Sequence, residues 1–105
     1  MLLHRDYFPA INSLPDDVYA MVDRYNNCDD IAINFAVSDA LDDASGVCVV
    51  PQKYAKIDKR GKRFKGLQAS DAHHSNRTRC LNELATMYGR MPLRYSDAFV
   101  VAMRL

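Results

Sequence analysis

The chain has 105 residues, of which 49% are hydrophobic and 26% charged, and its formal net charge is +1. This length predicts one domain or part of one, and the composition is ordinary for a soluble globular protein. The near-neutral charge gives no indication of a nucleic-acid or acidic-membrane partner, and no apolar run reaches the roughly 20 residues of a membrane span. Because the first residues lack the long apolar centre of a secretory signal, either the chain is cytosolic or its targeting segment is missing from it.

The first strong helix signal follows residues 1–12, which carry little regular pattern. Ser13 is a candidate for the N-cap or for the residue just before it, and Pro15 suits the first turn of a helix. Apolar residues then recur at helical spacing until about Asn26, and this pattern predicts an amphipathic helix. The apolar face consists of Val18, Met21, Val22 and Tyr25.

A second helix is predicted from Asp29 to about Ala40. Asn27 is a candidate N-cap, and the acidic pair Asp29 and Asp30 complements the positive end of the helix dipole. Asn27, Asp30 and Asn34 fall on one face of this otherwise apolar segment. The polar stripe is either a satisfied internal hydrogen-bond network or the lining of a site, because buried polar groups need partners in both cases.

The middle of the chain changes character twice. After a turn over residues 42–46, the β-branched run at 47–50 predicts a short strand closed by Pro51. Residues 53–65 then hold seven Lys and Arg against a single Asp. This stretch is either a contact for a polyanion or phosphate or a mobile, solvated surface loop.

A third helix is predicted from Asp71 or Ser75 to Gly89, which is a natural residue for a helix end. Its apolar face comprises Leu81, Leu84, Ala85 and Tyr88. His73 and Arg77 are four residues apart and share a face if this turn is helical. Such a pair either grips a phosphate or is simply solvated at the helix start. The tail from residue 93 is predicted to be extended.

Two further motifs concern covalent chemistry. Cys28, Cys48 and Cys80 lack the C-x-x-C spacing of a zinc site. They are either three reduced thiols or one disulfide with an odd thiol, and their spacing does not choose the pair. Residues 76–78, Asn-Arg-Thr, form an N-glycosylation acceptor. The sequence holds neither a Gly-rich phosphate loop nor a nucleophile elbow.

Three ordered blocks of the chain carry a family resemblance. Residues 27–35, Asn-Cys-Asp-Asp-Ile-Ala-Ile-Asn-Phe, look like the block Asn-Cys-Glu/Asp-Asp-Ile-Ala-Met-Asn-Phe of the exostosin-like glycosyltransferases (glycosyltransferase family 64). Residues 77–84, Arg-Thr-Arg-Cys-Leu-Asn-Glu-Leu, resemble that family's Arg-Ser-x-Cys-Ile-Asn-Lys-Leu. Residues 88–95, Tyr-Gly-Arg-Met-Pro-Leu-Arg-Tyr, resemble its Tyr-Gly-x-Met-Pro-Leu-x-Tyr. The resemblance covers roughly residues 4–95 and only the C-terminal part of the family's catalytic domain.

The resemblance implies an α+β fragment, the C-terminal portion of a GT-A type α/β glycosyltransferase fold, or a truncated gene product with that content. We expect about three helices with a short strand and an extended tail, in a single partial domain over residues 1–105 with a mobile basic loop at 53–65. The implied reaction is a retaining transfer of an N-acetylhexosamine from a UDP-sugar to a glycan acceptor, in proteoglycan or related glycan synthesis.

The resemblance also implies a setting. The Mn²⁺ ligands are expected upstream, outside this chain, so we expect the chain alone to be inactive. The Golgi or endoplasmic reticulum lumen is the expected location, and a membrane would be reached only through a segment absent from this chain. No nucleic acid is expected as a partner, and an oligomer stays open.

The resemblance assigns site residues as well. Asp30 matches the family's active-site carboxylate near the reacting sugar carbon and the acceptor hydroxyl. Arg77 matches the arginine near the donor diphosphate and sugar, so these two residues are the expected catalytic pair. Asn27 matches a residue that helps to hold the acceptor, and His73 matches a histidine of the donor loop. With Arg77, they are the expected substrate-binding residues.

Cys28 and Cys80 match the family's disulfide, which leaves Cys48 unpaired. The basic loop at 53–65 departs from the family pattern, and it supports the alternative of a non-catalytic domain that binds an acidic glycan. Because a glycan on Asn76 would crowd the neighbouring arginine, we predict that this acceptor is unoccupied in an active enzyme.

Overall fold

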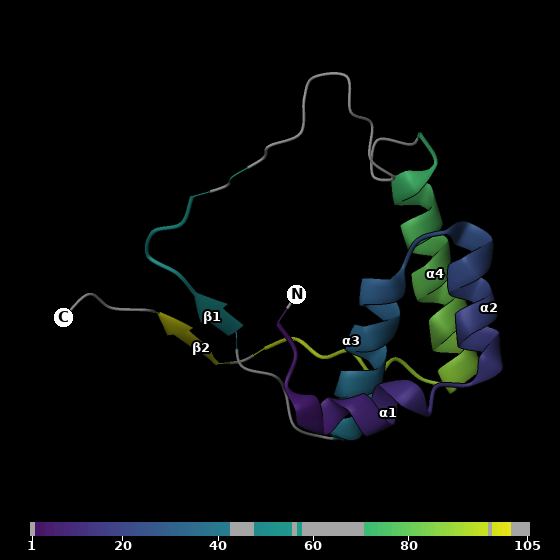
Figure 1. Cartoon of the computed structure of the whole chain (residues 1–105), viewed down its shortest axis with the longest axis horizontal. Coiled ribbons are helices and arrows are strands. Elements are labelled where there is room, and N and C mark those ends of the chain that lie inside the picture. Colours follow the sequence, from purple (N-terminus) through teal and green to yellow (C-terminus); the bar gives the residue numbers. More distant parts are fainter. Residues whose placement is uncertain (1, 43–47, 56, 58–70, 97, 102–105) are drawn as a thin grey trace.

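The computed structural model describes residues 2–42, 48–55, 57, 71–96 and 98–101. Within these ranges the helices pack together on one side of the molecule, and the two strands pair apart from them (Figure 1). This content confirms the predicted α+β class. In chain order the elements are the 3₁₀ turn η1 (Arg5–Tyr7), α1 (Phe8–Asn12), α2 (Asp16–Tyr25), α3 (Asp29–Ala40), β1 (Cys48–Val50), α4 (His73–Tyr88) and β2 (Phe99–Val101).

The N-terminal segment is more regular than its sequence indicated. The turn η1 and the single-turn helix α1 occupy most of the stretch for which no structure was predicted. The prediction of Ser13 as an N-cap is wrong, because this residue closes α1 and its hydroxyl donates to the Pro9 carbonyl oxygen at 2.6 Å. Pro15, with extended backbone, takes the N-cap position of α2 instead. A helix of five residues is too short to display a periodic apolar face.

Helix α3 runs over the predicted residues, but it begins differently. Asn27 is not its N-cap: Cys28 occupies that position with a left-handed φ of 75° and makes no capping hydrogen bond. The Asn27 Oδ1 instead accepts from the Cys28 N–H at 2.7 Å, so it is turned away from the unpaired N–H groups of α3. Asp29 and Asp30 lie in the first turn as expected, where their charges favour the helix.

Helices α2, α3 and α4 enclose the core. The predicted apolar face of α2 is confirmed, and that of α4 is confirmed for Leu81, Leu84 and Tyr88 but not for Ala85. Leu81 and Tyr88 pack at the edge of the core, and the Tyr88 ring lies 5.5 Å from that of Phe35. Helix α4 ends as predicted at Gly89. This residue has a left-handed φ of 68°, a conformation that glycine adopts with little strain because it has no Cβ. The buried cluster consists of Val18, Met21, Cys28, Ile31, Ala32, Phe35, Cys80 and Leu84.

Strands β1 and β2 pair in parallel, with Val49 opposite Val100. The predicted strand and extended tail are thereby confirmed for residues 48–50 and 99–101, while position 47 and positions 102–105 lie outside the described residues. Most of the basic loop predicted at 53–65 also lies outside them, and its described part is exposed. Among the described residues, no helix is long and apolar enough to cross a membrane.

Candidate functional site

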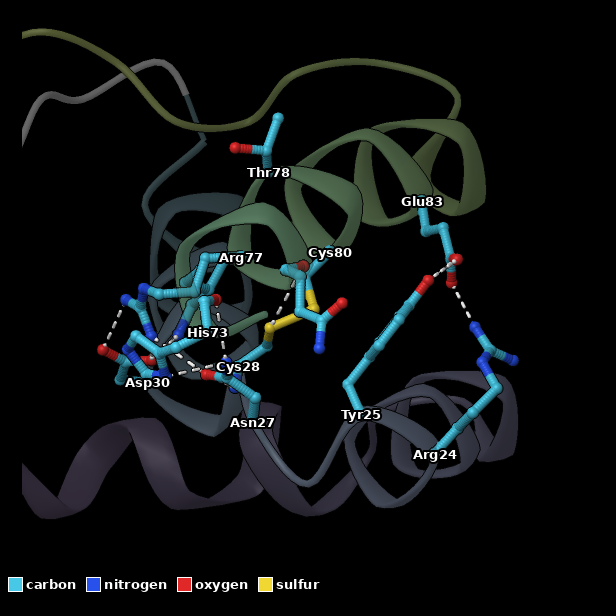
Figure 2. The surroundings of a disulfide bond; sticks show 12 residues. Arg24, Tyr25, Asn27, Cys28, Asp30, His73, Arg77, Thr78, Cys80 and Glu83 are labelled. Atoms are coloured by element: carbon cyan, nitrogen blue, oxygen red, sulfur yellow. Dashed lines mark hydrogen bonds and ion pairs between the residues drawn. A yellow bond between two sulfur atoms is a disulfide. The ribbon is translucent and has the colours of Figure 1, made fainter. Parts of the chain in front are cut away.

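One face of α4 reaches the junction between α2 and α3, which comprises residues 24–30 (Figure 2). The four side chains on this face are spaced by four, three and three positions, so successive turns of the helix bring them to the same side. We call them the α4 seam. They are His73, Arg77, Cys80 and Glu83.

The centre of the seam is an ion pair between Arg77 and Asp30. Arg77 Nη2 donates to Asp30 Oδ2 at 2.9 Å, and Nη1 donates to Oδ1 at 3.0 Å, so the contact is bidentate. The Arg77 side chain is 30% exposed and that of Asp30 43%, so both can be reached by a ligand. The hydrogen bonds from Arg77 hold the pKa of Asp30 below its usual value, although burial acts in the opposite direction. Asp30 is therefore an anion at neutral pH.

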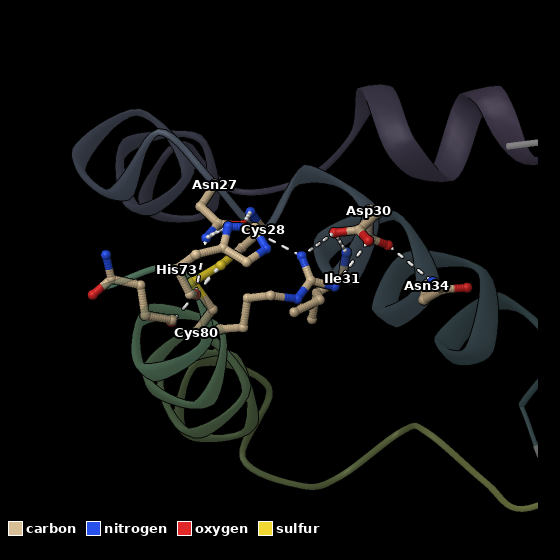
Figure 3. A network of polar contacts seen from close by, with 9 residues as sticks. Asn27, Cys28, Asp30, Ile31, Asn34, His73 and Cys80 are labelled. Carbon is tan, nitrogen blue, oxygen red and sulfur yellow. Dashed lines mark hydrogen bonds and ion pairs between the residues drawn. A yellow bond between two sulfur atoms is a disulfide. The ribbon is translucent and has the colours of Figure 1, made fainter. Parts of the chain in front are cut away.

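Asn27 links the ion pair to the start of α4 (Figure 3). Its Nδ2 donates to the ring Nδ1 of His73 at 3.1 Å and to the His73 carbonyl oxygen at 3.2 Å. Its Oδ1 accepts from the Cys28 N–H at 2.7 Å and from Arg77 Nη1 at 3.3 Å. These four bonds use the two donors and two lone pairs of the carboxamide. Asn27 is thus fully engaged inside the protein.

The imidazole of His73 accepts a hydrogen bond from the Asn27 carboxamide at Nδ1, which leaves Nε2 as the ring nitrogen that can donate to a ligand. The ring meets that of His74 edge-on, with 5.2 Å between the centroids. The sequence placed His73 and Arg77 on one face, and the structure brings both to Asn27. Asn27 therefore bridges the His73 ring and the Arg77 guanidinium.

A disulfide joins Cys28 to Cys80 with an S–S distance of 2.07 Å, which is the pair implied by the family resemblance. Both cysteines are fully buried and lie 52 residues apart in the sequence. The bond ties the N-cap position of α3 to the middle of α4. It therefore fixes, by covalent linkage, the same two helices that carry Asp30 and Arg77.

The cluster around Glu83 was not predicted from the sequence. Its Oε1 accepts from the Tyr25 hydroxyl at 2.6 Å, and its Oε2 accepts from Arg24 Nη2 at 2.5 Å. The Arg24 guanidinium also lies over the Tyr25 ring, 4.9 Å from its centroid. The available signal was positional, because Glu83 follows Cys80 by three residues and so shares its helix face. The cluster pins the last turn of α2 to α4.

An open cleft of about 710 Å³ lies between α3, α4 and the segment 93–96, next to the ion pair of Asp30 and Arg77. Arg77 and Asn34 both line it. Asn34, however, donates back to the Asp30 carbonyl oxygen of its own helix at 3.0 Å and takes no part in the network around Asn27. The predicted polar stripe on α3 therefore divides: Asn27 is satisfied internally, whereas Asp30 and Asn34 are accessible.

The chain is similar to known proteins along almost its whole length. The glycosyl transferase family 64 domain profile matches residues 1–104. Exostosin-like 2 from Mus musculus is 33% identical over 94 residues, covering 90% of this chain and 28% of that protein. Exostosin-1b from Danio rerio is 35% identical over 98 residues, covering 91% of this chain and 13% of that protein. Exostosin-2 from Bos taurus is 35% identical over 81 residues, covering 77% of this chain and 11% of that protein.

The chain thus spans little more than a quarter of the length of exostosin-like 2 and a smaller share of the two exostosins. The matched region includes the three blocks on which the resemblance rests, with Asp30 in the first and Arg77 in the second. Since the family profile covers nearly all of its residues, this chain belongs to glycosyltransferase family 64.

Proposed function

We propose that this chain is the C-terminal part of the catalytic domain of a retaining glycosyltransferase with a GT-A fold. The enzyme would transfer an N-acetylhexosamine from a UDP-sugar to a glycan acceptor, in proteoglycan or related glycan synthesis in the Golgi or endoplasmic reticulum lumen. The observation that carries the proposal is the accessible, bidentate ion pair between Asp30 and Arg77. Family membership supports transferase chemistry in general.

Asp30 would act through its negative charge. As the bond between the sugar carbon and the diphosphate oxygen breaks, positive charge develops on the sugar ring, and a nearby carboxylate stabilises it. Because Arg77 lowers the pKa of Asp30, this carboxylate is ionised and is also a weak base. We therefore assign it electrostatic stabilisation at the sugar carbon and the acceptor hydroxyl, and no proton transfer.

Arg77 would act on the leaving group. A guanidinium has five N–H donors, of which the contacts to Asp30 and Asn27 use three. The remaining two, on Nε and Nη2, can donate to diphosphate oxygens while the pair with Asp30 persists. Charge-assisted bonds of this kind stabilise the negative charge that UDP gains as it departs.

Asn27 and His73 would support the pair and contribute to substrate binding. Because Asn27 has no free hydrogen-bonding capacity, any contact with an acceptor must replace one of its four bonds. The main role of Asn27 is to hold Arg77 in place through the hydrogen bond from Arg77 Nη1 to its Oδ1. His73 keeps its Nε2–H available for a ligand oxygen, since the interaction with Asn27 uses only Nδ1.

Mn²⁺ is the expected cofactor of the family. Within the described part of the chain, no group of three or more His, Cys, Asp and Glu side chains could hold a metal ion. Asp30 is already engaged by Arg77. The donor set of the described residues therefore does not fit a metal site, and we propose that the Mn²⁺ ligands lie in the upstream part of the enzyme.

The proposal is tested by joining the 105 residues to the upstream part of a family 64 domain and assaying transfer from UDP-N-acetylhexosamines with Mn²⁺. We expect transfer by the joined protein, loss of transfer in its Arg77→Ala variant, and none from the 105 residues alone. A folded joined protein that binds UDP but transfers no sugar would contradict the proposal. Binding of an acidic glycan by that inactive protein would support a non-catalytic binding domain instead.

A further inference from the structure

We propose that Asn76 is an N-glycosylation site that is used only while the first turns of α4 are open. A glycan on Asn76 and the closed pair of Asp30 and Arg77 then exclude each other. The proposal relies on the secretory location given above, because glycan transfer to Asn-x-Thr takes place there. It does not rely on any transferase activity of the chain.

The helix separates the two side chains that the acceptor motif must present together. In an extended chain, residues i and i+2 point to the same face, so Asn76 and Thr78 can meet one enzyme surface. In α4 they are about 200° apart around the helix axis. Figure 2 shows Thr78 on the side of α4 away from the disulfide, and its hydroxyl donates to the His74 carbonyl oxygen at 3.4 Å.

The backbone of Asn76 faces the other way. Its carbonyl oxygen lies 3.8 Å from Sγ of Cys28 in the disulfide, and its N–H donates to the Ala72 carbonyl oxygen at 2.9 Å. The residue is half-buried. The middle residue of the motif is Arg77, which is held by Asp30. Extending the motif for modification therefore breaks the ion pair and moves α4 away from Cys28.

The first turns of α4 depend on these distant contacts. Ala72 offers no capping side chain, and the first turn contains no acidic residue. Histidines at positions 73 and 74 do not complement the positive end of the helix dipole. Helix ends with such weak local signals fray unless tertiary contacts hold them. Here the holding contacts are the disulfide, the ion pair and Asn27.

Disulfide closure and glycan transfer therefore compete for the same segment of the nascent chain. Once Cys28 and Cys80 are joined, α4 docks and the motif stays helical. If the glycan is attached first, a bulky hydrophilic group at Asn76 lies beside the surface that must pack against Cys28. Molecules with the disulfide should be free of the glycan, and molecules with the glycan should lack the disulfide.

The test is to secrete the full chain from eukaryotic cells behind a cleavable signal sequence, with a second Asn-x-Thr motif added after Leu105 as an internal standard. Glycan occupancy at Asn76 is measured by intact mass and peptide mapping. Cys80→Ser should raise occupancy at Asn76 severalfold over the unchanged protein. Cys48→Ser, which removes a cysteine outside the disulfide, should not raise it, and Thr78→Ala should abolish it.

A second variant tests the proposal independently in case Cys80→Ser misfolds. Asp30→Asn keeps both cysteines and removes the charge that holds Arg77, so it should raise occupancy to a smaller extent. Two results would overturn the proposal. One is a high occupancy of Asn76 in unchanged molecules that contain the disulfide. The other is an unmodified Asn76 in Cys80→Ser when the added motif is fully used. Neither result bears on sugar transfer by the enzyme.

Discussion

The guanidinium of Arg77 on α4 holds both carboxylate oxygens of Asp30 on α3, which precedes it by 47 residues. The contact stands within the α4 seam, next to a disulfide and a fully engaged Asn27. The seam therefore both joins the helices and orients the pair. Changes at Cys80 and Glu83 should act mainly on folding stability, whereas changes at the ion pair should act mainly on chemistry.

The disulfide should be a large contributor to stability. Loss of the bond in Cys80→Ser should lower the free energy of unfolding by about 4 kcal/mol, since a link across 52 residues restricts the unfolded chain by that amount in the chain-entropy account. Urea unfolding of the oxidised and reduced protein measures the difference, and Cys48→Ser is the matched control. Peptide mapping under non-reducing conditions that found Cys28 joined to Cys48 would refute the assignment.

The ion pair should give the protein a dependence on acidic pH. Because the pKa of Asp30 is lowered in the folded state, its contribution is present above the unfolded pKa and is lost as the pH falls through the folded value, below about pH 4. With 43% of the Asp30 side chain exposed, solvent screening limits the contribution to about 1 kcal/mol or less. Asp30→Asn should thus be less stable than the parent at neutral pH, and the gap should close in acid. A difference in the free energy of unfolding that stays constant with pH would contradict a stabilising role for the ion pair.

The Glu83 cluster should stabilise the attachment of α2 to α4. Tyr25→Phe removes the 2.6 Å hydrogen bond and leaves a carboxylate oxygen without that donor, at a cost of about 1 kcal/mol. Tyr19→Phe is the matched control, because its hydroxyl donates to the Ile11 carbonyl oxygen at 2.9 Å outside the seam. We expect a smaller loss in the control, measured by urea unfolding. Equal losses would show that the seam adds nothing special at this position.

The longer helices were predictable because each carries a local signal. The apolar repeat from Val18 to Tyr25 predicted α2, the acidic pair at 29–30 predicted the start of α3, and Gly89 predicted the end of α4. Helix α1 was not predictable in the same way, because five residues do not complete a periodic pattern. The parallel pairing of β1 with β2 was also missed, since it joins segments 51 residues apart (48 and 99) without any local cue.

The family blocks singled out Asn27, Asp30 and Arg77, which the structure brings together, but they did not indicate the contacts among them. Asn27 illustrates the difference. Its position before an acidic pair favoured an N-cap, yet its carboxamide bonds across the seam to His73 and Arg77. The left-handed backbone at Cys28 is what turns it away from α3. A tertiary contact thus overrode a local preference, and only the packing of α4 reveals it.

The central claim is that Asp30 acts in catalysis and not only in folding. The most direct measurement is sugar transfer per folded molecule, together with the melting temperature, for Asp30→Asn in the protein joined to its upstream half. We expect transfer to fall by about 10²-fold or more, as for other lost electrostatic stabilisers, while the melting temperature falls only by the few degrees that a loss of about 1 kcal/mol or less produces. Arg77→Lys, which keeps the charge but loses the bidentate contact, should also lose most of the transfer. A destabilised Asp30→Asn enzyme with full activity per folded molecule would contradict the account.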